Sequence, residues 1–179
     1  MTFLQILFKR NNNFSFLGVL IEHLDIGGIK LTQPGYYEKL AKLADMEGCK
    51  TALTPSINRS SHDAADSQEK IDNKDYLRML GSINYIMSMT RPDIAHAASL
   101  CAVKASSPTT RDMNDLKRII RYLLGTSEKG IYFRRTGGIE LVGYVDASFA
   151  THVDRKSQTG YFFSLGPHDA AFYARSCKQ

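Results

Sequence analysis

The chain has 179 residues, of which 43% are hydrophobic and 23% are charged, and its net charge is +5. This composition is typical of a globular protein with one or two small domains. It excludes a disordered chain and, without an apolar run of about 18 residues, a transmembrane helix. Three widely spaced cysteines and five scattered histidines support neither a disulfide framework nor a zinc site.

The first predicted elements follow a short apolar start. Residues 1–10 lack a basic residue before their apolar part and a small-residue cleavage site after it, so we expect no signal peptide and an intracellular location, cytoplasmic or nuclear. Residues 16–22 read as one strand, residues 25–28 as a turn and residues 29–33 as a second strand with period two. Together they predict a hairpin. Pro34 then opens a helix that ends before Gly48.

A polar segment separates this part from three predicted helices. Residues 51–73 are rich in Ser, Asn and Asp, which favours a linker and a boundary. The helices are expected at 75–89, 94–105 and 111–124, the last with an N-cap supplied by residues 107–110. One side of the last helix is an apolar stripe, and Lys117, Arg118 and Arg121 cluster on the other side.

The last fifty residues change to the period of strands. Strands are expected at 130–135, 139–146, 159–165 and 170–176, and they predict an antiparallel meander in sequence order. The strand at 139–146 ends in one carboxylate, Asp146, which could ligate Mg²⁺ at the rim of a sheet.

The positive charge is concentrated in residues 104–135, which hold eight basic and three acidic residues and so account for the whole net charge. Phosphate backbones attract a basic excess of this size. A solvated helix face beside a charged turn is the other interpretation.

Short motifs along the chain occur in a recognisable order. They are FLGVLI (16–21), GIKLTQ (28–33), TP (54–55), YLRMLGSINY (76–85), TRPDIA (90–95), LLGT (123–126), KGI (129–131), GYVDAS (143–148), DRKSQTGY (154–161) and CKQ (177–179). In this order they resemble the Pol polyprotein of copia-type LTR retrotransposons, from Phe16 to Gln179.

The resemblance implies an α+β fold in four parts. Residues 1–50 would be the end of the reverse transcriptase palm and the start of its thumb, and residues 51–73 a polar linker. Residues 74–126 would be the helical thumb and connection, and residues 127–179 a truncated ribonuclease H-like domain with its first three strands. The expected architecture is therefore a palm-type hairpin and a helical thumb and connection, followed by an incomplete ribonuclease H-like sheet.

The resemblance also makes Asp146 the first ribonuclease H carboxylate and a weak candidate Mg²⁺ ligand. Where the family usually has Asp-Ala-Asp-Trp, this chain has Ser148 and Phe149 in the last two places. Two ions about 3.5–4 Å apart need several carboxylates, and the nearest spare ones, Asp154 and Asp169, fall in predicted turns. The intact family uses Mg²⁺, but we expect Asp146 to be orphaned here, with no ion bound tightly and no catalytic activity.

Nucleic-acid binding depends on many contacts and is less sensitive to truncation. The candidate contacts are Lys117, Arg118, Arg121, Arg134 and Arg135. The expected partners are an RNA–DNA hybrid or duplex and the remainder of the Pol polyprotein, with no membrane. In the full polyprotein the segment would serve RNA-directed DNA synthesis. The alternatives are a non-enzymatic nucleic-acid binder, an interaction protein co-opted by its host, and a pseudogene product without function.

Overall fold

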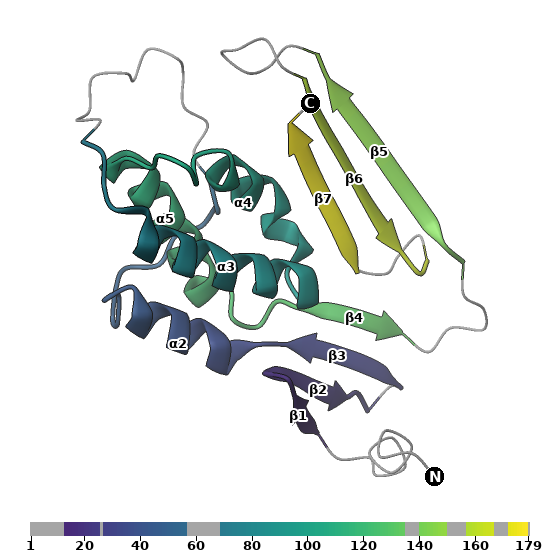
Figure 1. Ribbon diagram of the computed structural model, residues 1–179. Helices are drawn as coiled ribbons and strands as arrows, with labels where there is room; N and C mark the ends of the chain where they lie inside the picture. The colour runs from purple at the N-terminus through teal and green to yellow at the C-terminus, as the bar shows by residue number, and fades with distance from the viewer. Residues whose placement is uncertain are drawn as a thin grey trace.

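The computed structural model describes residues 13–25, 27–56, 69–134, 140–149, 157–166 and 172–178. These residues form an α+β structure in which four α-helices gather on one side and two separate antiparallel sheets lie beside them (Figure 1). The α+β class predicted from the sequence is thereby confirmed. The division of the chain into palm, thumb and ribonuclease H parts stays a prediction.

The first sheet contains the predicted hairpin. Its strands are β1 (Phe14–Phe16), β2 (Val19–His23), β3 (Gly28–Thr32) and β4 (Ile131–Arg134), in that order across the sheet. The single strand expected at 16–22 is broken, because the chain reverses at Leu17 and Gly18. Both have positive φ, 50° and 78°, as a tight two-residue hairpin turn requires. This turn creates β1, which the sequence pattern did not predict.

Strand β4 forms where expected but pairs elsewhere. It lies antiparallel to β3, with Ile131 opposite Leu31, and not beside the next strand of the chain. The predicted four-stranded C-terminal meander is therefore wrong in its first member. Gly130 explains the close approach, because a Cβ on this residue would lie 2.1 Å from the carbonyl oxygen of Leu31. A period of two predicts a strand, whereas its partner depends on such long-range fits.

The helices follow the apolar periodicity of the sequence. They are α2 (Pro34–Leu43), α3 (Asn73–Met89), the 3₁₀ turn η1 (Pro92–Ile94), α4 (Ala95–Ala102) and α5 (Thr110–Gly125). The α5 helix begins with a capping box, in which Thr109 accepts from the Asp112 amide and Asp112 accepts from the Thr109 amide. Pro92 stops α3, since its ring cannot continue a helix.

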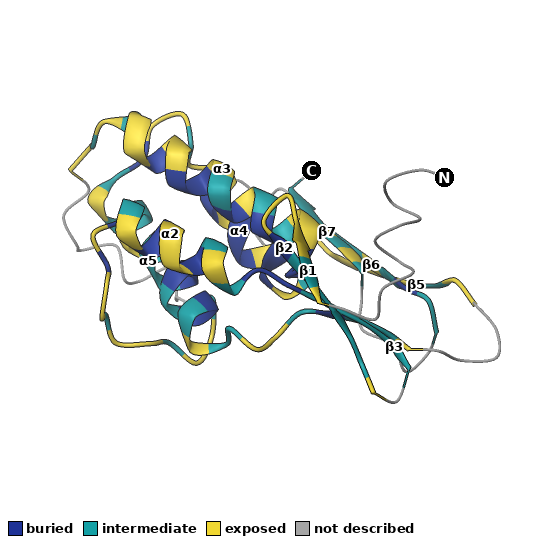
Figure 2. Ribbon diagram, turned by 90° about the horizontal axis from the view of Figure 1, so that it is seen from below, coloured by how far each residue is buried: buried dark blue, intermediate teal, exposed yellow. Residues whose placement is uncertain are grey.

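All four α-helices contribute to one hydrophobic core. Figure 2 shows their buried faces turned toward each other. Ile83 of α3 and Leu116 and Leu123 of α5 are fully buried, and each such side chain contributes about 1.5–3 kcal/mol. Tyr37 and Leu40 bring α2 into the same core. The polar segment 51–73 therefore connects helices that pack together.

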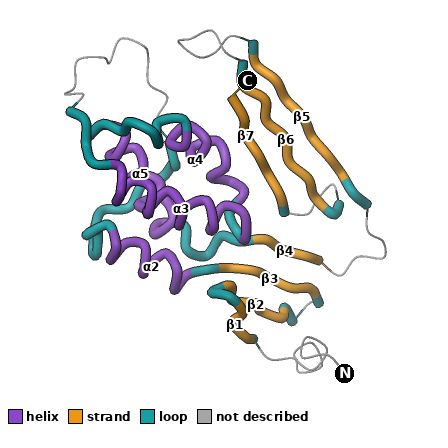
Figure 3. The backbone as a smooth tube through the Cα atoms, viewed as in Figure 1, coloured by secondary structure: helices purple, strands orange, loops and turns teal. Residues whose placement is uncertain are grey.

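The second sheet lies beside the helices and is separate from the first. Its strands β5 (Val142–Ser148), β6 (Gln158–Ser164) and β7 (Tyr173–Lys178) are antiparallel and follow sequence order, as predicted for these three. Strand β7 is nearest to α4 and β5 is the outermost strand (Figure 3). His96 Nδ1 on α4 lies 3.3 Å from Ser176 Oγ on β7, which links the sheet to the helices.

Candidate functional site

An ion pair between a buried arginine and a partly exposed aspartate lies where the helices meet the first sheet. Arg91 is 1% exposed and makes a two-pronged contact with Asp93. Arg91 Nε donates to Asp93 Oδ1 at 2.9 Å, and Nη2 donates to Oδ2 at 2.8 Å. Pro92 between them fixes the turn that brings the two side chains together. Bidentate hydrogen bonding between a guanidinium and a carboxylate is among the strongest kinds of charged hydrogen bonding in proteins.

Residues at the end of α5 complete this network. Arg91 also donates to the carbonyl and the hydroxyl oxygens of Thr126, at 3.1 and 2.7 Å. The Tyr122 hydroxyl donates to Asp93 Oδ2 at 2.8 Å and accepts from Lys129 Nζ at 3.2 Å. The guanidinium of Arg91 stacks over the Tyr122 ring, 5.3 Å from its centroid. The network therefore ties the turn between α3 and η1 to the end of α5 and to the loop that precedes β4.

The electrostatics of the pair favour both charged forms. Burial alone would raise the pKa of Asp93, but the hydrogen bond and the positive charge of Arg91 outweigh it and lower that pKa. Burial opposes the charge of Arg91 as well, and Asp93 more than compensates, so the pKa of Arg91 is raised. Both oxygens of Asp93 are committed to structural bonds. This network is consequently a structural joint and not a set of groups available for catalysis.

Asp146 occupies an open position on the second sheet. It is exposed on β5, opposite Gly160 of β6. It borders a groove of about 560 Å³ between this sheet and the corner formed by η1 and α4, to which Tyr144, Phe162 and His96 also contribute. The aromatic rings of Tyr144 and Phe162 stack at 4.7 Å. The groove therefore places the exposed Asp146 carboxylate beside two stacked aromatic rings.

The groove does not supply a partner carboxylate for Asp146. The other carboxylate in its lining is Asp93, whose oxygens bind Arg91 and Tyr122. Across the described ranges, no group of three His, Cys, Asp or Glu side chains is arranged to hold a metal ion. The described residues therefore do not fit the two-metal Mg²⁺ site of the family. Asp154 and Asp169 lie outside the described residues.

The predicted basic residues lie on separate elements. Lys117, Arg118 and Arg121 share α5, as predicted, and all three are half-buried. Arg118 Nη2 donates to Thr54 Oγ1 at 2.9 Å, so the α5 cluster contacts the segment at 51–56. Arg134 is exposed at the end of β4 in the first sheet. Arg135 lies outside the described residues.

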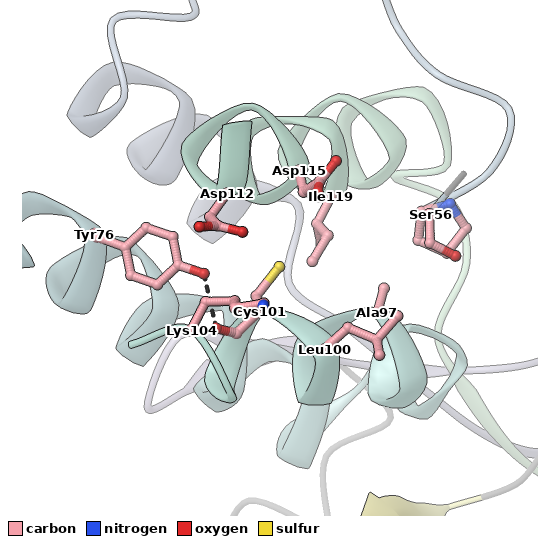
Figure 4. A pocket seen from close by; sticks show the side chains of 10 residues that line it. Ser56, Tyr76, Ala97, Leu100, Cys101, Lys104, Asp112, Asp115 and Ile119 are labelled. Atoms are coloured by element: carbon pink, nitrogen blue, oxygen red, sulfur yellow. Dashed lines mark hydrogen bonds between the residues drawn. The ribbon is translucent and has the colours of Figure 1, made fainter. Parts of the chain in front are cut away.

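A small pocket between α3, α4 and α5 carries a cysteine. Figure 4 shows Cys101 and Ile119 directed into a pocket of about 150 Å³, with the Tyr76 hydroxyl donating to the Cys101 carbonyl oxygen at 2.8 Å. Burial raises the pKa of the Cys101 thiol to about 12, so the thiol is protonated at neutral pH and is a poor nucleophile. Asp112, also in the lining, is held by the capping box. The pocket is part of the helical core.

Sequence reasoning missed the Arg91–Asp93 joint. There, residues 90–95 served only as one of the motifs of the resemblance. A signal was present in the sequence: Arg91 and Asp93 are separated only by Pro92 and stand between two strongly apolar predicted helices. This pattern could have indicated an ion pair. Charges in such a place are buried only when they are paired.

Curated relatives match most of the chain. It is 30% identical over 164 residues to the Retrovirus-related Pol polyprotein from transposon RE1 of Arabidopsis thaliana, covering 91% of this chain and 11% of the relative. It is 33% identical over 142 residues to the corresponding polyprotein from transposon TNT 1-94 of Nicotiana tabacum, covering 75% and 11%. The relatives that align with most of this chain thus include retrotransposon polyproteins.

A further relative has a different name. The chain is 44% identical over 94 residues to Secreted RxLR effector protein 161 of Plasmopara viticola, covering 52% of this chain and 66% of the effector. No protein-family model matches the chain, and no solved structure matches it.

The chain is homologous, over about 90% of its length, to the Pol polyproteins of copia-type retrotransposons. The resemblance predicted from the sequence is confirmed. The chain spans only about a tenth of the length of the polyproteins it matches, 11% in each of the two cases above. Among the described residues, no helix is long and apolar enough to cross a bilayer.

Proposed function

We propose that this chain is the C-terminal part of a reverse transcriptase joined to the start of a ribonuclease H domain. In a complete Pol polyprotein such a segment serves RNA-directed DNA synthesis. The observation that carries the proposal is the second sheet. Its three antiparallel strands follow sequence order, and its first strand bears Asp146. Both features agree with the resemblance to the first three ribonuclease H strands.

By itself the chain is catalytically inactive in this proposal. Hydrolysis of an RNA strand by two Mg²⁺ ions needs carboxylates that hold both ions, and the lining of the Asp146 groove offers Asp146 while Asp93 is bound to Arg91. The intact family's Mg²⁺ would therefore bind weakly here. The test is incubation of an RNA–DNA hybrid with the purified chain in Mg²⁺ or Mn²⁺. Cleavage that Asp146→Asn abolishes would refute the inactivity.

The remaining role of the segment is to hold nucleic acid. Lys117 and Arg121 are four residues apart on α5, about 6 Å along the helix axis, and Arg118 lies between them. Each cation that neutralises a phosphate adds about 0.9 to the salt dependence of binding. The proposed ligand is an RNA–DNA hybrid, with the remainder of the polyprotein as the other partner.

Binding is tested by fluorescence anisotropy with a labelled hybrid over a series of salt concentrations. We expect Lys117→Ala with Arg121→Ala to weaken binding and to reduce the salt slope by about 1.8. The matched control is Lys74→Ala with Arg78→Ala, because these two residues are exposed and also four apart, on α3. Binding that ignores salt, or equal effects of the two double variants, would contradict the proposal.

A second candidate is a secreted, non-enzymatic interaction protein co-opted by a host. The 44% identity to the named effector over 52% of the chain favours it. Mass spectrometry of the N-terminus of the protein isolated from its cells distinguishes the two. An intact Met1 on protein inside cells supports the retrotransposon segment, whereas a processed N-terminus on extracellular protein supports the second candidate.

A further inference from the structure

The segment at 51–56 lies against α5. The Ala52 amide donates to the Arg121 carbonyl oxygen at 3.3 Å. Ser56 lines the pocket of Figure 4 together with Ile119 of α5. The segment is neither helix nor strand. It is therefore a stretch of irregular backbone that is fixed beside α5 at both of its ends.

Thr54 presents its hydroxyl at the surface of this segment. The residue is exposed and is followed by Pro55. Its hydroxyl donates to the Ser56 carbonyl oxygen at 3.0 Å and accepts from Arg118 Nη2 at 2.9 Å. A threonine directly before a proline is the minimal sequence that proline-directed protein kinases accept. The Thr54 hydroxyl therefore combines an accessible kinase motif with a guanidinium that already contacts the oxygen to be modified.

Arg118 is one member of the basic cluster on α5. Arg121 follows it by three residues, and Lys117 precedes Arg121 by four, which are the spacings of neighbours on one helix face. The Nε atoms of Arg118 and Arg121 are buried and have no hydrogen-bond partner among the described residues. The nearest carboxylate along α5 is Asp115, one turn before Arg118. The cluster thus carries three positive charges against one carboxylate, and its guanidiniums have hydrogen-bonding capacity left.

We propose that Thr54 is a phosphorylation site and that its phosphate binds to Arg118 and Arg121. A proline-directed kinase transfers the γ-phosphoryl group of ATP to Thr54 Oγ1. The bond to ADP breaks, the bond to Oγ1 forms, and the hydroxyl proton passes to the catalytic base of the kinase. The hydrogen bond to the Ser56 carbonyl oxygen is lost with that proton. In its place the side chain presents three acceptor oxygens and a charge of about −1.5 to −2 to the arginine that contacts Oγ1.

The bound phosphate withdraws cations of α5 from nucleic acid. A charge of about −2 offsets two of the three positive charges of Lys117, Arg118 and Arg121. This consequence rests on the proposed function, whereas the phosphate site rests on the contact between Thr54 and Arg118. Each lost phosphate contact lowers the salt slope of binding by about 0.9, so phosphorylation should lower it by about 1.8. The affinity for the hybrid at about 0.1 M salt should then fall by more than about tenfold.

The sequence contains one other pair of this kind, Ser107 with Pro108, which supplies a matched control. Ser107 is exposed and precedes the N-cap of α5, whereas Arg118 lies about 12 Å along the helix axis from Thr110. The full 179-residue chain is treated with a mitogen-activated protein kinase, Mg²⁺ and ATP. The variant Ser107→Ala is modified at Thr54 alone, and Thr54→Ala at Ser107 alone. Mass spectrometry verifies the modified residue in each case.

Phosphorus NMR during a pH titration then measures the contact between the phosphate and Arg118. A nearby positive charge favours the dianionic phosphate, so the Thr54 phosphate should lose its last proton at a lower pH while Arg118 is present. Arg118→Ala should raise the midpoint of that titration by about half a pH unit or more. The same substitution should leave the midpoint of the Ser107 phosphate unchanged. Far-UV circular dichroism verifies that Arg118→Ala retains the fold.

A Thr54 that the kinase leaves unmodified overturns the proposal, and so does an effect of Arg118→Ala that is absent or equal at the two phosphates. Anisotropy with the labelled hybrid tests the consequence separately. A salt slope that falls on phosphorylation of Thr54 and not of Ser107 supports it, and an unchanged slope contradicts it. If the unmodified chain does not bind the hybrid, the proposed function fails, while the NMR titration still decides the phosphate site.

Discussion

Replacing Asp93 by alanine tests the contribution of its ion pair with the buried Arg91. The substitution removes two charged hydrogen bonds, of 2.9 and 2.8 Å, from a guanidinium that is 1% exposed. It also removes the acceptor of the Tyr122 hydroxyl. Arg91 keeps its two contacts with Thr126. The result is a buried positive charge without its counter-ion.

The magnitude follows from what remains around Arg91. Removing one partner of a buried pair costs about 3–5 kcal/mol. The lower end applies here, because the Asp93 side chain is 36% exposed and the Thr126 oxygens still accept. We therefore expect the free energy of unfolding to fall by about 3 kcal/mol. For a chain of this size this lowers Tm by about 6–12 °C.

Urea unfolding followed by far-UV circular dichroism measures the effect, since the chain has no tryptophan. The control is Glu47→Ala, which breaks an ion pair with Lys42 whose side chains are both more than 60% exposed, 67% and 68%. Such surface pairs contribute less than about 1 kcal/mol. A loss for Asp93→Ala no larger than for Glu47→Ala would refute the reasoning. In addition, Arg91→Met combined with Asp93→Ala should cost less than the sum of the single losses.

Three further predictions concern the same structure. Because the pKa of Asp93 is lowered from 3.8 in the folded state, its stabilisation is present above that pH and lost as the pH falls through the lower folded value. The difference in unfolding free energy between the wild type and Asp93→Asn should shrink in that acid range, and a constant difference would contradict it. Gly130→Ala should lower the unfolding free energy by about 2 kcal/mol or more, since its Cβ meets the Leu31 carbonyl oxygen. Gly35→Ala, with nothing within 4 Å, should lower it little or raise it; similar losses would refute the steric argument. A thiol reagent at neutral pH should modify buried Cys101 more slowly than half-buried Cys49 and Cys177, and equal rates would contradict the burial.

Local patterns predicted the helices well because their signals are local. The α5 helix was expected at 111–124 and spans Thr110–Gly125. Its apolar stripe supplies Leu116, Ile119, Ile120 and Leu123 to the core. The N-cap, expected within residues 107–110, is Thr109. The cap, the stripe and the stop all act within a few residues of each other. For the same reason the clustering of Lys117, Arg118 and Arg121 was predictable.

The partners of strands and of charges were not predictable from local patterns. Strand β4 pairs with β3, which precedes it by about a hundred residues in the chain, Ile131 facing Leu31. The period-two pattern of polar and apolar residues in β4 does not indicate which strand it pairs with. The close approach of Gly130 to the Leu31 carbonyl oxygen explains the pairing. The hydrogen bonds of Arg91 likewise depend on Thr126, which lies thirty-five residues further along the chain. Both depend on how the helices pack, which no single segment encodes.

The central claim is that this segment holds an RNA–DNA hybrid without cleaving it. One measurement tests both parts: a time course in which a labelled hybrid is incubated with an excess of the chain in Mg²⁺ and resolved on parallel native and denaturing gels. We expect a retarded hybrid whose strands stay intact, with a shift that weakens as salt increases. Cleaved RNA, or a hybrid that is never retarded even at low salt, would contradict it.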